Sequence, residues 1–126
     1  MCAARASARV SAMGTTVLIV DDHAAFRASA RALLESDGFE VVGEAADGAS
    51  VPEAVERLRP AIVLLDVQLP DLDGFEVAAR LPSGGPVIVL TSTRSISAFR
   101  RRLAQTGLPF IAKSDLSGEA LSAAAG

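Results

Sequence analysis

Short apolar runs alternate along the chain with segments in which apolar residues recur every three or four positions. A continuous apolar run indicates a strand that is buried on both faces of a sheet. Glycine, proline and aspartate stand between the segments and predict turns. Five apolar runs predict strands over residues 17–20, 39–45, 61–65, 87–90 and 110–112.

The segments between these runs predict amphipathic helices. In the first segment, Phe26, Ala30, Leu33 and Leu34 fall on one stripe of a helix, and Gly38 ends it. The remaining helices are predicted near residues 51–60, 75–81, 96–107 and 116–125. Strands that alternate with helices predict an α/β fold, a (βα)5 unit whose parallel sheet carries helices on both faces.

Two helix starts carry capping signals. Ser50 and Glu53 match a capping box, and Pro52 lies in the first turn of the same helix. Asp71 and Asp73 are interpreted as the residues that start and cap the third helix.

Composition narrows the class of protein. The chain has 126 residues, half of them hydrophobic, and a net charge of −3, which fits one domain with a core. We predict a disordered tail over residues 1–14 and a domain over residues 15–126. The 15 acidic side chains all lie in the domain with 10 basic ones, which argues against binding of nucleic acid by general charge. Cys2 is the single cysteine, so no internal disulfide can form and a cytoplasmic, reducing location is expected.

Polar residues gather where the predicted strands end. Asp21 and Asp22 follow the first strand, Asp66 the third, Thr91 the fourth and Lys113 the fifth. The carboxyl ends of parallel strands meet at one edge of the sheet, so these side chains should share a site. Strand-end acids are often only caps and turn formers, but five such residues at one edge favour a functional site.

The predicted cluster suits phosphoryl transfer. Three carboxylates in one pocket repel each other, and Mg²⁺ with oxygen ligands would relieve that repulsion. Lys113, the single lysine among 12 basic residues, offers a compact ammonium that can pair with a phosphoryl oxygen. The hydroxyl of Thr91 can donate to another. A carboxylate nucleophile would then give an acyl phosphate.

Four motifs together resemble the receiver domain of bacterial two-component response regulators. The motifs are residues 17–23 (VLIVDDH), 66–74 (DVQLPDLDG), 87–92 (VIVLTS) and 110–113 (FIAK), and the resemblance covers roughly residues 15–125. The chain looks like the subfamily that is usually fused to a helix-turn-helix output domain. The resemblance implies a three-layer, doubly wound, flavodoxin-like and CheY-like fold with strand order 2-1-3-4-5.

The resemblance also implies roles for single residues. Asp66 would accept the phosphoryl group. Asp22 would bind the metal directly, Asp21 would hold a metal-bound water, and the backbone carbonyl of Gln68 would complete the set around Mg²⁺, for which Mn²⁺ can substitute.

The remaining roles concern the phosphoryl group and the nearby loop. Thr91 would be the switch hydroxyl, Phe110 the switch aromatic and Lys113 the cation that pairs with the phosphoryl group. Pro70 and Gly74 would shape the loop beside Asp66.

Partners follow from the same resemblance. A sensor histidine kinase or phosphotransfer protein would supply the phosphoryl group, and the face of helix four, strand five and helix five would change state, with a homodimer through that face as an option. The chain would catalyse only its own phosphorylation and dephosphorylation, and it would bind neither nucleic acid nor a membrane. Ser114 stands where the family commonly has proline, and no output domain is seen in the sequence.

Other interpretations remain open. A receiver-like interaction module that is never phosphorylated is the main alternative, and a phosphate sink is a variant of the first hypothesis. A hydrolase or flavin carrier on the same fold is a third, although the sequence has no P-loop. We interpret His23 as a helix-start residue because Mg²⁺ prefers oxygen ligands. Arg100–Arg102 is interpreted as a solvated helix face, with a partner contact as the alternative.

Overall fold

The computed structural model describes residues 13–126 and contains a parallel sheet of five strands in the order β2-β1-β3-β4-β5. Neighbouring strands are in parallel register, for example with Asp66 of β3 opposite Thr91 of β4. The predicted fold class and strand order are therefore confirmed. The strands are β1 (Thr16–Val20), β2 (Glu40–Ala45), β3 (Ile62–Asp66), β4 (Val87–Ser92) and β5 (Phe110–Ala112).

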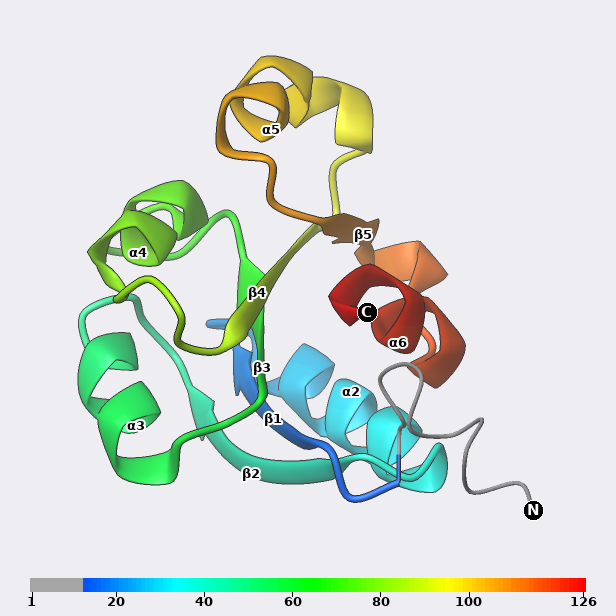
Figure 1. Cartoon of the computed structure of the whole chain (residues 1–126). Helices are drawn as coiled ribbons and strands as arrows, with labels where there is room; N and C mark the ends of the chain where they lie inside the picture. Colours follow the sequence, from blue (N-terminus) through cyan, green and yellow to red (C-terminus); the bar gives the residue numbers. More distant parts are fainter. Residues whose placement is uncertain (1–12) are drawn as a thin grey trace.

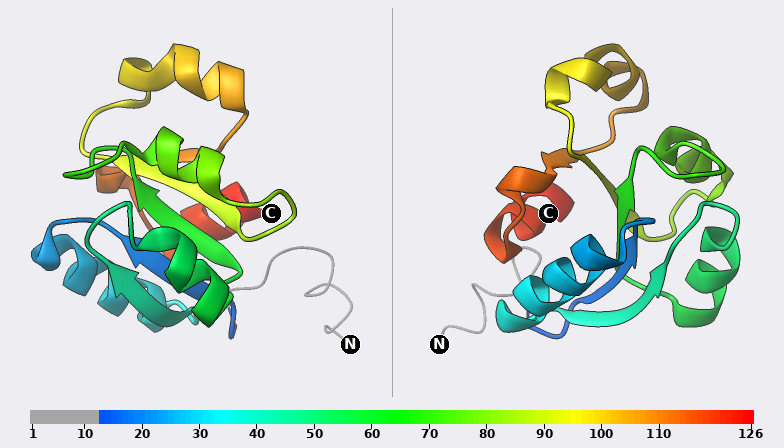
Figure 2. Two further views of the ribbon diagram at one scale, coloured as in Figure 1. Left: turned by 90° about the vertical axis from the view of Figure 1, so that its left-hand side faces the viewer. Right: turned by 180° about the vertical axis from the view of Figure 1, so that it is seen from behind.

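Helices cover both faces of the sheet, as the views from two sides show (Figure 1, Figure 2). One layer holds α2 and α6, and the other holds α3 and α4, while α5 stands beside the β4–β5 end. The helices are α2 (Ala24–Ser36), α3 (Val51–Leu58), α4 (Gly74–Arg80), α5 (Arg100–Thr106) and α6 (Gly118–Ala125), with 3₁₀ turns η1 (Ile96–Phe99) and η2 (Lys113–Asp115).

Two apolar clusters form the core, one on each face of the sheet. Alternate residues of a strand point to opposite faces, so Leu18 packs under α3 and α4 whereas Ile19 packs under α2 and α6. All five residues of β3 are buried, as expected for the central strand of a sheet covered on both sides.

Helix α2 buries a narrower stripe than the sequence predicts. Ala30 and Leu34 are buried and Phe26 is half-buried, but Leu33 is 37 % exposed. Leu33 lies at the edge of the predicted stripe and is not buried with Ala30 and Leu34.

The predicted capping box at the start of α3 is also wrong. Ser50 is the N-cap residue, but its backbone is helical (φ −84°, ψ −8°) and its side chain makes no capping hydrogen bond. An N-cap side chain reaches the helix amides from an extended backbone, which Ser50 lacks. Asp47 instead accepts a hydrogen bond from the Ser50 amide at 2.9 Å. Pro52 does lie in the first turn, as predicted.

The fourth helical segment divides into η1 and α5. The helical spacing predicts Ile96 on the inner face, but Ile96 is 55 % exposed, whereas Phe99 is buried. Tight 3₁₀ geometry turns Ile96 outward relative to the regular helix that the sequence predicts. Gly107 ends α5 with φ 70°, in agreement with the prediction.

Most of the predicted tail, residues 1–12, lies outside the described residues. Among residues 13–126 no helix has the length and apolarity that a bilayer crossing requires. The peptide bond between Lys113 and Ser114 is trans, as are all others in that range.

Candidate phosphoacceptor site

The carboxyl ends of the strands bring the predicted polar residues to one edge of the sheet. Asp21 and Asp22 follow β1, Asp66 is the last residue of β3, and Thr91 lies beside Asp66 in β4. Lys113 follows β5 and approaches from the far side of β4. The convergence that the sequence predicts therefore occurs, with the correction that Thr91 and Ser92 are part of β4 and do not follow it.

Lys113 is the central cation of this edge. Its Nζ contacts Oδ2 of Asp21 and lies 3.3 Å from Oδ2 of Asp66. Asp21 is fully buried, Asp66 is 2 % exposed, and the Lys113 side chain is 10 % exposed. One ammonium thus neutralises part of the charge of two buried carboxylates, which would otherwise repel each other strongly.

The two buried carboxylates differ in acidity. Burial raises the pKa of Asp66 to about 6, and the nearby charge of Asp21 adds to the rise, although the Gln68 amide and Lys113 oppose it. Burial also raises the pKa of Asp21, but hydrogen bonds from Lys113 and His23 outweigh burial and leave that pKa below its ordinary value. Asp21 is therefore the carboxylate that stays ionised to lower pH.

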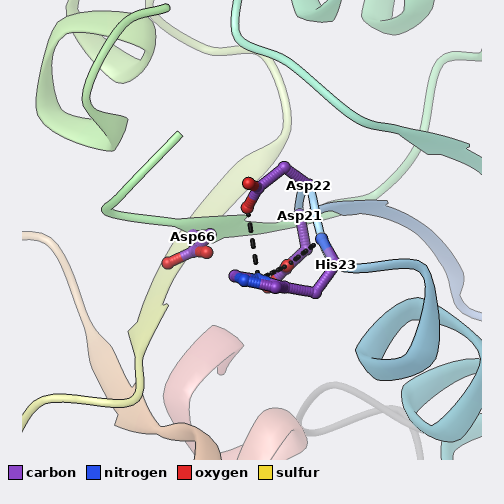
Figure 3. Close-up of side chains that lie close together, drawn as sticks. All are labelled: Asp21, Asp22, His23 and Asp66. Atoms are coloured by element: carbon purple, nitrogen blue, oxygen red, sulfur yellow. Dashed lines mark hydrogen bonds and ion pairs between the residues drawn. The ribbon is translucent and has the colours of Figure 1, made fainter. Parts of the chain in front are cut away.

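His23 starts α2 as predicted and also takes part in the acidic cluster. It is the N-cap residue of α2, and its amide donates to Oδ1 of Asp21 at 2.8 Å. Its Nδ1 lies 3.0 Å from Asp21 Oδ1 and 3.2 Å from Asp22 Oδ1, and Figure 3 marks the interactions of His23 with both residues. The position of His23 directly after the acidic pair hinted at this contact, but the orientation of its ring depends on the loop conformation.

The acidic residues can hold a divalent cation. Asp21, Asp22, His23 and Asp66 each offer one ligand atom, and these atoms lie within 4.8 Å of one another (Figure 3). Oδ2 of Asp21 is buried, and among the described residues its partner is the Lys113 ammonium. Three carboxylates in this space suit a hard cation with oxygen ligands.

Thr91 is buried at the floor of the site. Its hydroxyl has no hydrogen-bond partner within residues 13–126. A buried hydroxyl without a partner is costly, and a group that bound beside Asp66 could satisfy it. The predicted position of Thr91 is consistent with a donor to such a group.

The loop after β3 holds Asp66 through main-chain contacts. The amide of Gln68 donates to Oδ1 of Asp66 at 3.1 Å, and the amide of Gly74 donates to the Val67 carbonyl at 2.7 Å. A Cβ at Gly74 would lie 2.6 Å from the Asp66 carbonyl oxygen, so no side chain fits there. Gly74 therefore shapes the loop as predicted, while Pro70 lies exposed in it.

Asp73 and Asp71 have different roles. Asp73 caps α4, as predicted, and the structure adds a capping box with Glu76. Asp71 does not start the helix, since its carboxylate accepts hydrogen bonds from the amides of Gly48 and Ala49 at 2.8 and 2.9 Å. These backbone hydrogen bonds lower the pKa of Asp71 and tie the β3–α4 loop to the β2–α3 loop. The sequence contains no local signal for such a long-range contact.

Three aromatic rings connect β5 with α4. The ring of Phe110, half-buried, lies 5.7 Å from that of Phe99, and Phe99 lies 6.3 Å from Phe75. Arg102 of α5 stacks over Phe75 at 4.1 Å and pairs with Asp73 at 2.7 Å. Arg102 of the Arg100–Arg102 run therefore makes defined intramolecular contacts, with Phe75 and Asp73.

Two residues of α2 support the site and were not predicted to do so. Arg27 donates from Nη1 to the carbonyl of Asp21 at 2.6 Å and from Nε to Glu44 at 2.9 Å. The sequence predicts Phe26 only as a residue of the apolar helix stripe. The centroid of its ring lies 4.4 Å from Nζ of Lys113.

The comparisons with known proteins agree with this geometry. The family model described as "Response regulator receiver domain" matches residues 17–124. The transcription regulator BvgA of Bordetella pertussis is 41 % identical over 115 residues, which cover 89 % of this chain and 55 % of BvgA. A transcriptional regulator of Pseudomonas aeruginosa is 40 % identical over 111 residues, covering 86 % of this chain and 54 % of that protein. The chain spans about half the length of these curated relatives.

Solved structures show the same fold. A two-component response regulator of the LuxR family from Aurantimonas superposes with a TM-score of 0.73 at 30 % identity, over 80 % of this chain and 75 % of that one. The signal receiver domain of the response regulator NarL from Mycobacterium tuberculosis gives a TM-score of 0.71 at 32 % identity. The match covers 88 % of this chain and 93 % of that one.

Proposed function

Since the chain belongs to the response regulator receiver family, we propose that it is a phosphorylation-dependent switch whose Asp66 accepts a phosphoryl group. A sensor histidine kinase or a phosphotransfer protein would be the donor, in the cytoplasm. The observation that carries the proposal is the position of Asp66, a buried carboxylate 3.3 Å from the single lysine ammonium and beside Asp21 and Asp22.

A divalent cation is part of the proposal. Asp21, Asp22 and Asp66 would hold Mg²⁺, or Mn²⁺ in its place, with the backbone carbonyl of Gln68 as a further ligand. The cation would screen the negative charges that meet when an anionic donor approaches a carboxylate. The observation in favour is that three carboxylates converge where only one ammonium opposes them.

The proposed transfer is a displacement at phosphorus. A carboxylate oxygen of Asp66 forms a bond to phosphorus while the bond between phosphorus and the donor's nitrogen or oxygen breaks, and that electron pair leaves with the donor. The Lys113 ammonium, already beside Asp66, would pair with one phosphoryl oxygen, and the Thr91 hydroxyl would donate to another. In this proposal the chain catalyses only its own phosphorylation and the hydrolysis of its acyl phosphate.

The output would be a change in the face formed by α5, β5 and α6. Movement of Thr91 toward the phosphoryl group would free space for Phe110, whose ring contacts Phe99 of η1. A homodimer through this face is one form that the output could take, without contact to nucleic acid by this chain.

Binding of beryllofluoride, a mimic of the phosphoryl group, tests the proposal. Fluorine NMR of the protein with Mg²⁺ should show bound beryllofluoride, and the signal should vanish with EDTA or with Asp66→Asn. Asp115→Asn, an exposed acid two residues beyond Lys113, is the matched control and should bind as the wild type does. A wild-type protein that binds no beryllofluoride would favour the alternative, an interaction module that works without phosphorylation.

A further inference from the structure

The ammonium of Lys113 is held from two directions. The carboxylates of Asp21 and Asp66 contact it on one side, and the ring of Phe26 lies over it with its centroid 4.4 Å from Nζ. We propose that Phe26 is a positioning residue that fixes Lys113 for phosphoryl transfer by a cation–π contact. The inference rests on the proposed function for its consequence, but the contact itself can be tested without phosphorylation.

The contact joins elements that are far apart in the chain. Phe26 lies in the first turn of α2, while Lys113 begins η2 after β5. Phe26 is half-buried and packs against the core cluster that α2 and α6 share. Because this packing fixes the ring, the ring can in turn restrict the lysine.

A lysine at this position needs such a restriction. Its long side chain loses rotamer entropy when it is fixed, and its ammonium lacks the planar fork that orients a guanidinium. The face of an aromatic ring attracts a cation, and it does so more strongly where water is excluded. The Lys113 side chain is only 10 % exposed, so little water weakens this contact.

A ring also serves this site better than a third acid would. The three N–H donors of an ammonium are needed by Asp21, Asp66 and an incoming phosphoryl oxygen. The face of Phe26 attracts the positive charge without accepting a conventional hydrogen bond, so it leaves all three donors available. It adds no negative charge that would repel an anionic donor.

Variants of Phe26 separate the charge contact from simple packing. Phe26→Leu keeps an apolar side chain but removes the aromatic face, whereas Phe26→Trp keeps and strengthens it. Phe39→Leu is the matched control, since Phe39 is buried in the same cluster but precedes β2, at the edge of the sheet opposite Lys113. Urea unfolding identifies any variant that fails to fold. If Phe26→Leu fails, trifluorophenylalanine at position 26 is used in its place. Fluorination weakens the attraction of the ring for a cation while it keeps the shape of the ring.

Lysine-specific ¹⁵N labelling gives one ammonium signal because Lys113 is the single lysine of the chain. In the protein without divalent cations, the order parameter of Nζ should fall in Phe26→Leu and in the fluorinated protein. It should stay at the wild-type level in Phe26→Trp and Phe39→Leu. Equal Nζ order in all of these proteins would overturn the proposal, whatever the chain does with phosphate.

A second measurement tests the consequence for function. The dissociation constant of beryllofluoride with Mg²⁺ should rise about five- to thirtyfold in Phe26→Leu, which corresponds to a loss of about 1 to 2 kcal/mol of cation–π attraction, and stay unchanged in Phe39→Leu. Equal effects of the two substitutions would show that Phe26 acts by packing alone. Failure of the wild type to bind beryllofluoride would reject the proposed function and leave the Nζ measurement as the test of the contact.

Discussion

The ammonium of Lys113 lies 3.3 Å from Oδ2 of Asp66, although 47 residues separate them in sequence. The same ammonium contacts Asp21, so loss of Lys113 would leave the buried carboxylates of Asp21 and Asp66 without this cation. We predict that Lys113→Met lowers the free energy of unfolding by about 3 kcal/mol near neutral pH without divalent cations. Urea unfolding measures the change, and added Mg²⁺ should restore part of it.

The control for that substitution is Arg101→Met. Arg101 is exposed on α5, and its loss should change stability by less than about 0.5 kcal/mol. A similar effect of both substitutions would mean that Lys113 does not neutralise the acidic pair.

Asp66 should make stability depend on pH. Burial and the charge of Asp21 raise its pKa from 3.8 to about 6 in the folded protein. The favourable contribution of the protonated carboxyl is complete below pH 3.8 and is lost as pH rises through about 6. Without divalent cations, Asp66→Asn should therefore exceed the wild type in stability by an amount that grows with pH, to about 3 kcal/mol near neutrality.

Comparison of Asp66→Asn with the wild type isolates the contribution of Asp66 to the pH dependence of stability, because Asp21 is present in both proteins. Unfolding curves measured at several pH values between 3.8 and about 6 give the difference in unfolding free energy between Asp66→Asn and the wild type. A difference that stays constant over this range would show that Asp66 has an ordinary pKa, and one that shrinks as pH rises would show a lowered pKa; either result contradicts the prediction.

The loop that carries Asp66 should not tolerate a side chain at Gly74. A Cβ there would lie 2.6 Å from the Asp66 carbonyl oxygen, which can move only with the strand. Gly74→Ala should cost about 2 kcal/mol of stability and weaken beryllofluoride binding by displacing Asp66. Gly85→Ala, whose Cβ would meet nothing closer than 3.2 Å, is the control and should cost less. Equal effects at both glycines would argue against close packing behind Asp66.

Asp73 should act separately as a helix cap and as an ion-pair partner. Its carboxylate accepts from the Glu76 amide at 2.9 Å and pairs with Arg102, which is 44 % exposed. Asp73→Asn keeps the cap and removes the charge, whereas Asp73→Ala removes both and should cost about 1 kcal/mol more. A double-mutant cycle with Arg102→Met should give a coupling below about 1 kcal/mol that falls with added salt. A coupling insensitive to salt would leave no role for charge in the contact.

The fold and much of the site could be predicted from sequence because both depend on regular features. Apolar runs identify the strands, and parallel strands bring their carboxyl ends together, so the order of the runs along the chain suffices to place Asp21, Asp66 and Lys113 at one edge. The capping role of Asp73 follows from local sequence in the same way.

Contacts between side chains from distant loops could not be predicted. The hydrogen bonds that the Gly48 and Ala49 amides donate to Asp71 depend on two irregular loops, and the orientation of the His23 ring depends on the turn after β1. Phe26 has the helical spacing of a core residue, and this spacing gives no sign of its contact with Lys113. Ser50 matched a capping pattern, but backbone conformation, which the pattern does not contain, decided otherwise.

The most direct test of the central claim is to locate the modified residue after incubation with acetyl phosphate and Mg²⁺. Intact-mass measurement followed by fragmentation should find one phosphoryl group, on Asp66. The group should be absent in Asp66→Asn and in EDTA, and present in Asp115→Asn. A phosphoryl group on another residue, or an unmodified wild-type chain under conditions that keep it folded, would contradict the account.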